Sequence, residues 1–306
     1  MKKLMVIAFV ALVLGACGRA QPWPDGAAYE QEVLQWRAER LAALKARSGY
    51  LNQVGLFWLE EGSHSVGSAP GSDVRLPLSS AADVGVFDVS QDGVRMRVNA
   101  GVDVFSGDEL VSDLLIADDT TEAPVEVTHG SIAWTAIKRD DRFAIRVRDF
   151  EQPFVETFGP LPYFPIDPSL RVPATLQRYD APRVANVDTV IEGLGYHPES
   201  PGVVSFEIEG ARFELEAYAS GERLFFVFGD ATNRDDTYGA GRFLYADLPG
   251  ADGKTIMDFN RSYSPPCAYN DFSTCPVASP RNRLPIHIEA GEKYDPELHY
   301  VSDTDH

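Results

Sequence analysis

Short runs in which apolar and polar residues alternate recur from Tyr50 almost to the end of the chain. Two such runs follow one another in the second half, 204–208 and 213–217, each followed by a glycine-containing turn, and a wholly apolar run, 224–228, comes next. Period-two alternation places every second side chain on the same face of a strand, so it is typical of a sheet with one buried face. Short turns join neighbouring strands antiparallel, and the pattern therefore predicts a meander here and a mainly β protein overall.

Three hairpins are predicted from alternating runs on either side of a turn. The paired runs are 84–89 with 94–98, 131–138 with 143–148, and 242–247 with 254–259. Leu284, Ile286 and Ile288 also alternate with polar residues, which predicts a last strand. We therefore expect a body of β-sandwich or barrel-like type.

One segment, residues 28–48, has helical spacing instead. Its apolar residues are Tyr29, Val33, Trp36, Leu41 and Leu44, with charged residues between them. Such a stripe predicts an amphipathic helix that packs on a sheet, and Gly49 is a natural stop for it. The expected fold is therefore a mainly β body with one N-terminal amphipathic helix.

The start of the chain determines the expected location. A basic start leads into an apolar run, 4–14, which is too short to span a bilayer but suits the core of a secretory signal. The run ends in Leu14-Gly15-Ala16-Cys17, which resembles the bacterial lipobox. The resemblance implies cleavage after Ala16 and a lipid such as palmitate on Cys17. An ordinary signal cleavage near Ala16 or Ala20 is the alternative.

The lipid and the net charge together define the expected partners. A lipid with several acyl chains on Cys17 anchors a protein stably, so we expect a membrane-anchored protein of the bacterial cell envelope that faces the periplasm. The chain carries 46 acidic and 27 basic residues, a net charge of −19. Such a surface repels phosphate groups, so nucleic acid is not an expected partner.

Composition along the chain divides it into six predicted segments. They are a signal peptide over 1–16, a tether over 17–27, the helix and a first β region over 28–152, a proline- and aromatic-rich crossing loop over 153–173, a second β region with the candidate site over 174–293, and an acidic tail, expected to fray, over 294–306.

The remaining cysteines, Cys267 and Cys275, form an even pair once Cys17 carries lipid. In an oxidising compartment such a pair predicts a disulfide, with free thiols or a metal site as alternatives. Zinc normally needs four close ligands, and the nearest histidine in sequence is His287. The glycine pair at 239–241 precedes a strand rather than a helix, which argues against a dinucleotide turn. We therefore expect no metal and no cofactor.

A short stretch resembles the opening of a forkhead-associated domain. The matching strings are 55–62, 65–67 and 72–76. Ser68 stands where phosphothreonine-binding members of that family carry an arginine, and without a cationic fork a phosphate lacks its bidentate partner. The resemblance implies a sandwich relationship and no phosphopeptide site.

A longer resemblance runs through the chain as a series of short strings. Among them are Trp36-Arg37, Arg146-Val147-Arg148-Asp149, Thr237-Tyr238-Gly239, Asp258-Phe259-Asn260, Pro265-Pro266-Cys267 and Ala290-Gly291-Glu292-Lys293. In this order the strings are similar to a bacterial family of secreted proteins that is known as a domain of unknown function. The resemblance implies no particular activity, but it implies that the C-terminal third carries the family's signature.

That C-terminal third contains the candidate binding residues, which are polar or aromatic and come from three late segments. They are Asp230, Thr232, Tyr238, Arg242, Asp258, Asn260, Tyr263, Asn282 and Arg283. If 242–247 and 254–259 form a hairpin, Arg242 lies near Asn260 and pairs with Asp258. Polar groups that converge on an apolar scaffold form small-ligand pockets, so we expect a lipoprotein that binds a small polar ligand, such as a saccharide or a peptide fragment.

Two other functions fit the same residues. Arg–Asp pairs and asparagines also tie loops to strands by satisfying backbone groups, which is the expectation for a structural envelope protein without a ligand. Asp230 and Asp258 are also candidates for paired carboxylates of a hydrolase, provided that they lie close together. The motifs G-x-S-x-G and H-E-x-x-H do not occur in the sequence, so no catalytic residue is assigned.

Overall fold

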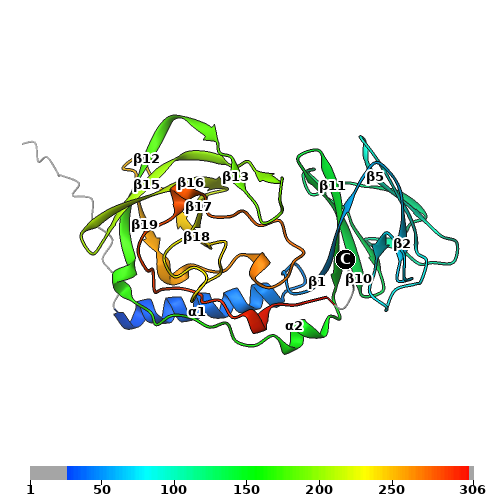
Figure 1. Cartoon of the computed structure of the whole chain (residues 1–306), viewed down its shortest axis with the longest axis horizontal. Coiled ribbons are helices and arrows are strands. Elements are labelled where there is room, and N and C mark those ends of the chain that lie inside the picture. Colours follow the sequence, from blue (N-terminus) through cyan, green and yellow to red (C-terminus); the bar gives the residue numbers. More distant parts are fainter. Residues whose placement is uncertain (1–25, 303–306) are drawn as a thin grey trace, which may run out of the picture.

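The computed structural model describes residues 26–302. The predicted signal peptide, the lipidation residue Cys17 and most of the predicted tether lie outside this range. Within it the chain forms two β lobes, and a long N-terminal helix, α1 (Gly26–Lys45), lies along the second lobe (Figure 1). Among the described residues, no helix has both the length and the apolar character that crossing a membrane requires. The predicted fold class, a mainly β body with one N-terminal helix, is confirmed.

The first lobe is built from eleven strands. They are β1 (Gln53–Leu59), β2 (Gly62–Gly67), β3 (Val74–Arg75), β4 (Gly85–Ser90), β5 (Gly93–Val98), β6 (Phe105–Ser106), β7 (Glu109–Leu110), β8 (Asp113–Ile116), β9 (Glu126–His129), β10 (Ile132–Arg139) and β11 (Arg142–Asp149). One sheet has the order β1-β11-β10-β9-β6-β7 and the other β3-β2-β4-β5-β8. The hairpins predicted over 84–98 and 131–148 are confirmed as β4–β5 and β10–β11.

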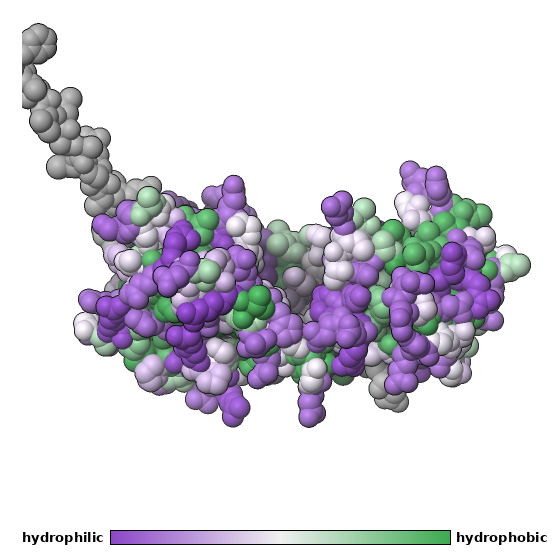
Figure 2. All heavy atoms as spheres, turned by 90° about the horizontal axis from the view of Figure 1, so that it is seen from above, coloured by the Kyte–Doolittle hydropathy of each residue, from purple (hydrophilic) through white to green (hydrophobic). Residues whose placement is uncertain are grey.

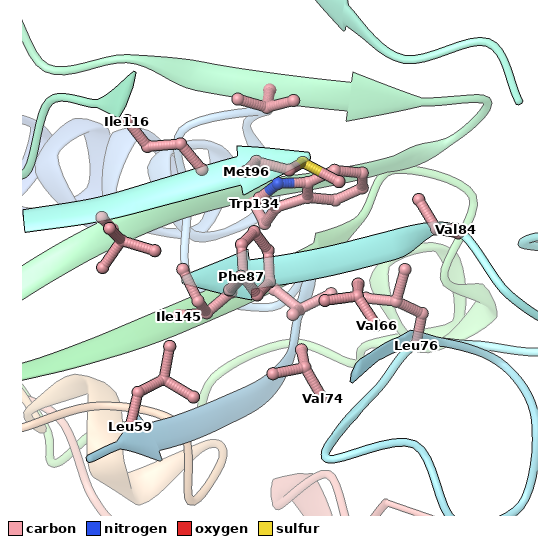
Figure 3. Packing of buried hydrophobic residues seen from close by; sticks show 14 of the residues in the cluster. Leu59, Val66, Val74, Leu76, Val84, Phe87, Met96, Ile116, Trp134 and Ile145 are labelled. Carbon is pink, nitrogen blue, oxygen red and sulfur yellow. The ribbon is translucent and has the colours of Figure 1, made fainter. Parts of the chain in front are cut away.

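The core of the first lobe lies between these two sheets (Figure 3). Phe87 from one sheet meets Trp134 from the other edge to face, with ring centroids 6.5 Å apart. Strand alternation explains the arrangement: Ile145 and Val147 of β11 point into the core, so Arg146 and Arg148 point to the opposite face. That opposite face is turned toward the second lobe (Figure 1).

The second lobe is a single antiparallel sheet that curls until it is nearly a barrel. Its strands are β12 (Arg171–Val184), β15 (Glu199–Ile208), β16 (Ala211–Ser220), β17 (Arg223–Phe228), β18 (Arg242–Asp247) and β19 (Lys254–Asp258), with the small pair β13 (Val187–Asp188) and β14 (Gly195–Tyr196) beside them. The order is β18-β17-β16-β15-β12-β19. The predicted meander is therefore confirmed, and its inward side chains, such as Val204, Leu215 and Phe226, fill the barrel.

Short helical turns and irregular segments complete the chain. They are α2 (Pro153–Thr157), η1 (Pro168–Leu170), η2 (Phe259–Arg261), η3 (Pro266–Ala268), η4 (Pro280–Asn282) and η5 (Pro296–Leu298). The tail was expected to fray, but this is wrong for residues 294–302. Tyr300 donates its backbone N–H to Tyr269, and its ring packs against Phe154 and Phe272. Aromatic side chains give this acidic segment enough apolar surface to pack.

Candidate functional site

The buried ion pair of the second lobe joins Arg242 to Asp230, and the predicted Arg242–Asp258 pair is wrong. The Nη2–Oδ2 distance is 2.6 Å, and both side chains are fully buried. The prediction assumed that β18 and β19 form a hairpin, whereas they occupy opposite edges of the sheet. Arg242 instead lies opposite Phe228 of β17, and Asp230 follows two residues later. Burial lowers the pKa of Arg242, and Asp230 acts against this effect.

Arg242 has further partners inside the lobe. It donates to the carbonyl oxygen of Ile288 at 2.8 Å and to Ser262 Oγ at 3.2 Å. Asp230 accepts from Thr232 Oγ1 at 2.6 Å. These contacts connect the late irregular segment to the barrel strands, and none of the groups points into open space.

Asp258 belongs to a second network, which ties α1 to the lobe. Its carboxylate accepts from the Tyr29 hydroxyl at 2.7 Å and lies 3.3 Å from Arg261 Nε. Asn260 donates to the carbonyl oxygen of Asp167 at 2.7 Å and accepts from the backbone N–H of the same residue at 2.8 Å. Burial, followed by the charge of Asp258, raises the pKa of Tyr29. Asp230 and Asp258 share no hydrogen-bond partner: Asp230 bonds to Arg242 and Thr232 inside the lobe, whereas Asp258 bonds to Tyr29 of α1.

The other predicted residues have separate partners. Asn282 bonds to the backbone of Glu216 and Val227, and Thr232 shares a hydroxyl hydrogen bond with Thr237. Tyr263 stacks on Tyr245 beneath Arg40, Tyr238 packs on Tyr294, and Arg283 is exposed beside Gly229. Most of these buried polar groups are hydrogen-bonded to other parts of the chain, an arrangement that stabilises connections rather than holds a ligand, although Arg242 Nε has no partner among the described residues. Three of the cavities that described residues line have none of the nine predicted residues in their walls.

Cys267 and Cys275 lie next to each other, but as free thiols. The predicted disulfide is therefore not formed in this structure. The Cys267 backbone N–H donates to Cys275 Sγ at 3.2 Å, and Cys267 Sγ donates to the carbonyl oxygen of Ser273 at 3.2 Å. Burial, followed by the neighbouring Cys267, raises the pKa of Cys275. The geometry thus brings the two sulfur atoms together without joining them.

The largest of the three cavities lies in the first lobe and has a volume of about 650 Å³. It opens where β1 ends and where the β4–β5 and β10–β11 turns meet, at one end of the sandwich. Leu59, Val89 and Phe143 are buried and apolar within it, and Trp58 is half-buried beside them. The remaining lining residues are polar: Glu60, Glu61, Ser90, Gln91, Lys138, Asp141 and Arg142.

Among the charged groups around this cavity, the two cations have aromatic partners, whereas the three carboxylates have no polar partner in the described part of the chain. The Arg142 guanidinium lies 4.3 Å from the centroid of a Trp58 ring, and the Lys138 ammonium lies 5.2 Å from that of Phe143. Both cations therefore have an aromatic partner. The carboxylates of Glu60, Glu61 and Asp141 form no ion pair and no hydrogen bond with any residue between 26 and 302. Three acceptor groups next to an indole are thus available to a ligand.

Few features of the sequence indicate this cavity. Trp58 lies in the string that also carries the forkhead-associated resemblance, but the rim residues sit in turns, where charged residues are ordinary. Their convergence depends on how the two sheets stack, which no local pattern encodes. That forkhead-associated resemblance stays a prediction.

Comparison with known proteins places the second lobe in a family. Residues 156–293 match the family described as "Protein of unknown function (DUF1684)". A solution NMR structure of an uncharacterised protein from Haloarcula marismortui is 30% identical over 46% of this chain and 79% of that chain, with a TM-score of 0.39. No curated protein matches. The predicted resemblance to a family of unknown function is therefore confirmed. The matched range excludes every residue that lines the first-lobe cavity.

Proposed function

Because the chain belongs to the DUF1684 family, whose function is unknown, we propose a function from the geometry of its own cavity: the protein binds a small, uncharged, hydroxyl-rich ligand, such as a saccharide unit, in the first lobe. One observation carries this proposal. Three carboxylates without partners stand beside the Trp58 indole at the mouth of a cavity of about 650 Å³.

The shape and lining of the cavity suit a ligand of this size. Small-molecule sites typically enclose about 300–1,000 Å³ and combine an apolar floor with a few polar groups. Here Leu59, Val89 and Phe143 supply the floor. The ring of a saccharide presents apolar C–H groups to such a surface and to the edge of Trp58, while its hydroxyls face outward.

The polar rim favours a ligand that donates several hydrogen bonds. Ionised carboxylates accept hydrogen bonds and do not donate them, so Glu60, Glu61 and Asp141 match hydroxyl groups. An anionic ligand is repelled by these carboxylates and by the net charge of −19. A cationic ligand meets Lys138 and Arg142 at the same mouth. An uncharged ligand avoids both penalties.

The proposed location is the bacterial cell envelope, with the protein held at a membrane by a lipid on Cys17. The support is the lipobox-like sequence that ends at Cys17. Replacement of Cys17 by serine removes the acylated thiol, so Cys17→Ser is expected to appear in the soluble fraction while the wild type sediments with membranes. Sedimentation of Cys17→Ser with membranes would contradict the anchor.

Calorimetric titration with neutral disaccharides tests the binding function. Cellobiose, maltose and chitobiose serve as probes on the Cys17→Ser chain. We expect at least one of them to bind with a Kd of about 1 mM or tighter. Trp58→Ala and Glu61→Gln should each weaken this binding about tenfold, which corresponds to the loss of one good contact. Glu109→Gln, an exposed change of the same chemistry on β7, is the matched control and should bind like the wild type.

Three results would contradict the proposal. The first is the absence of binding for all three sugars at about 10 mM. The second is equal binding by the wild type and Trp58→Ala when both are folded by circular dichroism. Binding of a polyamine such as spermidine in place of the sugars would show that the carboxylates recognise cations, which also contradicts it.

A further inference from the structure

Arg146 and Arg148 of β11 lie on the face of the first lobe that is turned toward the second lobe, and neither has an acidic partner. Within residues 26–302, no carboxylate oxygen comes within the 4.0 Å of an ion pair of either guanidinium. What distinguishes these two from other cations without an ion pair is their position: they lie two residues apart on the same face of β11, and burial lowers the pKa of both.

Existing hydrogen bonds use few of the donors that these arginines offer. Arg146 Nε donates to the carbonyl oxygen of Phe272 in the second lobe at 3.2 Å. Arg148 Nη1 donates to Asn52 Oδ1 at 2.6 Å and to the carbonyl oxygen of Gly49. A guanidinium has five N–H donors in a planar fork. The two Nη groups of Arg146 have no hydrogen-bond partner among the described residues, so its fork is free.

The electrostatic environment shows that positive charge is poorly compensated at this point. Burial, followed by the charges of Arg139 and Arg148, lowers the pKa of Arg146 to about 10. Burial also lowers the pKa of Arg148, and the charge of Glu126 acts against this effect. The carboxylate of Asp119 lies close by but is already paired with Arg139, at 2.8 Å. A desolvated cation without a counterion is costly to a fold, and an anion placed between the guanidinium groups removes that cost.

The surroundings of the two arginines contribute hydroxyl groups, and the region between the lobes is open to solvent. Tyr50 is 38% exposed and acts electrostatically on both arginines, although burial is the larger effect on each pKa. Thr274, on the segment of the second lobe that contacts β11, accepts from Arg139 Nε at 3.4 Å. Figure 2, which views the side opposite α1, shows that the surface is hollowed between the two lobes. Solvent can therefore enter the region where the lobes meet.

We propose that Arg146 and Arg148 form a binding site for a small oxyanion, a carboxylate or a phosphate group, held between the two lobes. The planar fork of arginine binds both groups through paired N–H donors, which a lysine does not reproduce. The site is separate from the first-lobe cavity in both residues and chemistry. Its failure or success therefore leaves the saccharide proposal unaffected.

A purely structural role for Arg146 explains less of what is observed. One hydrogen bond to Phe272 ties the lobes together, and it requires only the Nε donor. It leaves the remaining donors of the guanidinium and the neighbouring charge of Arg148 unexplained. The two readings differ in a measurable way, because only an anion site makes binding and stability depend on added oxyanion.

Titration with inorganic phosphate and with citrate separates the two oxyanion classes. We expect one or both to bind the Cys17→Ser chain and to raise its Tm, with weaker binding at higher salt because the contact is ionic. Arg146→Gln removes the charge and the fork, and it should weaken binding at least about tenfold. Arg146→Lys keeps the charge without the planar fork, so its affinity for the anion should lie between those of the wild type and Arg146→Gln. Arg212→Gln, an exposed arginine paired with Glu214 on β16, is the control and should bind like the wild type.

The proposal is overturned if neither anion binds at about 10 mM, or if folded Arg146→Gln binds as tightly as the wild type. Binding of citrate alone identifies a carboxylate site and binding of phosphate alone a phosphate site. If Arg146→Gln does not fold, the NMR signal of the Arg146 Nε–Hε group in the wild type tests whether the anion site exists. Its shift on addition of either anion supports the site, and an unchanged signal overturns it.

Discussion

Arg40 of α1 and Glu292, at the far end of the family region, form an ion pair whose carboxylate is completely buried. The distance from Arg40 Nε to Glu292 Oε2 is 3.4 Å. The other carboxylate oxygen accepts from the backbone N–H of Ser264 at 3.1 Å and from the Tyr269 hydroxyl. The same guanidinium lies 4.4 Å from the centroid of the Tyr263 ring. The N-terminal helix is therefore an integral part of the second lobe.

Removal of Arg40 should strongly destabilise the protein. Arg40→Met leaves the Glu292 carboxylate buried without its cation, which typically costs about 3–5 kcal/mol of unfolding free energy. Urea unfolding monitored by circular dichroism measures the change. Arg212→Met, which breaks an exposed pair with Glu214, is the control and should cost about 1 kcal/mol or less. Equal losses in the two variants would contradict the role assigned to Arg40.

The Asp230–Arg242 pair should behave as one energetic unit. Asp230→Asn and Arg242→Met should each lower the free energy of unfolding by about 3 kcal/mol or more, because each leaves a charged or polar partner unsatisfied in the barrel. The double variant should lose much less than the sum, since no unpaired charge remains. Urea unfolding of the four chains gives the coupling energy. Additive losses would show that the two side chains stabilise the fold independently.

How far the sequence predicts the fold depends on the range of the interaction concerned. The β4–β5 and β10–β11 hairpins follow from local alternation and turns, and they were predicted close to their observed bounds. The position of β19 was not predictable in this way, because it pairs with β12, about eighty residues earlier, rather than with its neighbour β18. This one difference moved the partner of Arg242 from Asp258 to Asp230.

The segment that ends at Ile288 shows the same limit. Leu284 and Ile288 are buried as the alternation predicts, but no strand forms there. The backbone of this segment bonds instead to the loop after β17, where Ala231 N donates to the carbonyl oxygen of Ile286 at 2.9 Å. The free fork of Arg146 was equally invisible to the sequence, because whether a cation finds a carboxylate depends on how two separate lobes meet.

High pH should destabilise the protein because several of its tyrosines are buried. Burial, followed by the charge of Glu292, raises the pKa of Tyr269 well above its ordinary value, and Tyr29 and Tyr263 are raised mainly by burial. Above about pH 10 these tyrosines ionise in the unfolded chain but keep their protons in the folded one. The folded chain then holds more protons than the unfolded chain. The unfolding free energy therefore falls by about 1.4 kcal/mol per pH unit for each such tyrosine.

Urea midpoints between about pH 8 and pH 11 test this dependence. The midpoint should be constant at the lower end and fall above about pH 10. Tyr269→Phe removes one contributing group and should make the decline shallower. A midpoint that stays level to pH 11 would show that the buried tyrosines ionise as readily in the folded chain as in the unfolded one.

The two neighbouring thiols should join in an oxidising environment. Cys267 and Cys275 are adjacent and enclose a loop of nine residues, for which the chain-entropy model gives a stabilisation of about 2.5 kcal/mol. Protein isolated from the periplasm without reductant is therefore expected to show no free thiol from this pair after unfolding, measured by alkylation and mass spectrometry. Two alkylated cysteines in that sample would mean that the thiols stay reduced.

The ligand site in the first lobe is tested most directly by the indole N–H signals of the chain in a two-dimensional NMR spectrum. The chain contains four tryptophans, of which Trp58 borders the cavity and Trp134 lies in the core behind it. On titration with the disaccharide that binds best, the account predicts a progressive shift of the Trp58 signal, which is absent from the spectrum of Trp58→Phe, while the Trp36 signal stays in place. A spectrum in which the Trp58 signal does not move at saturating sugar would contradict it.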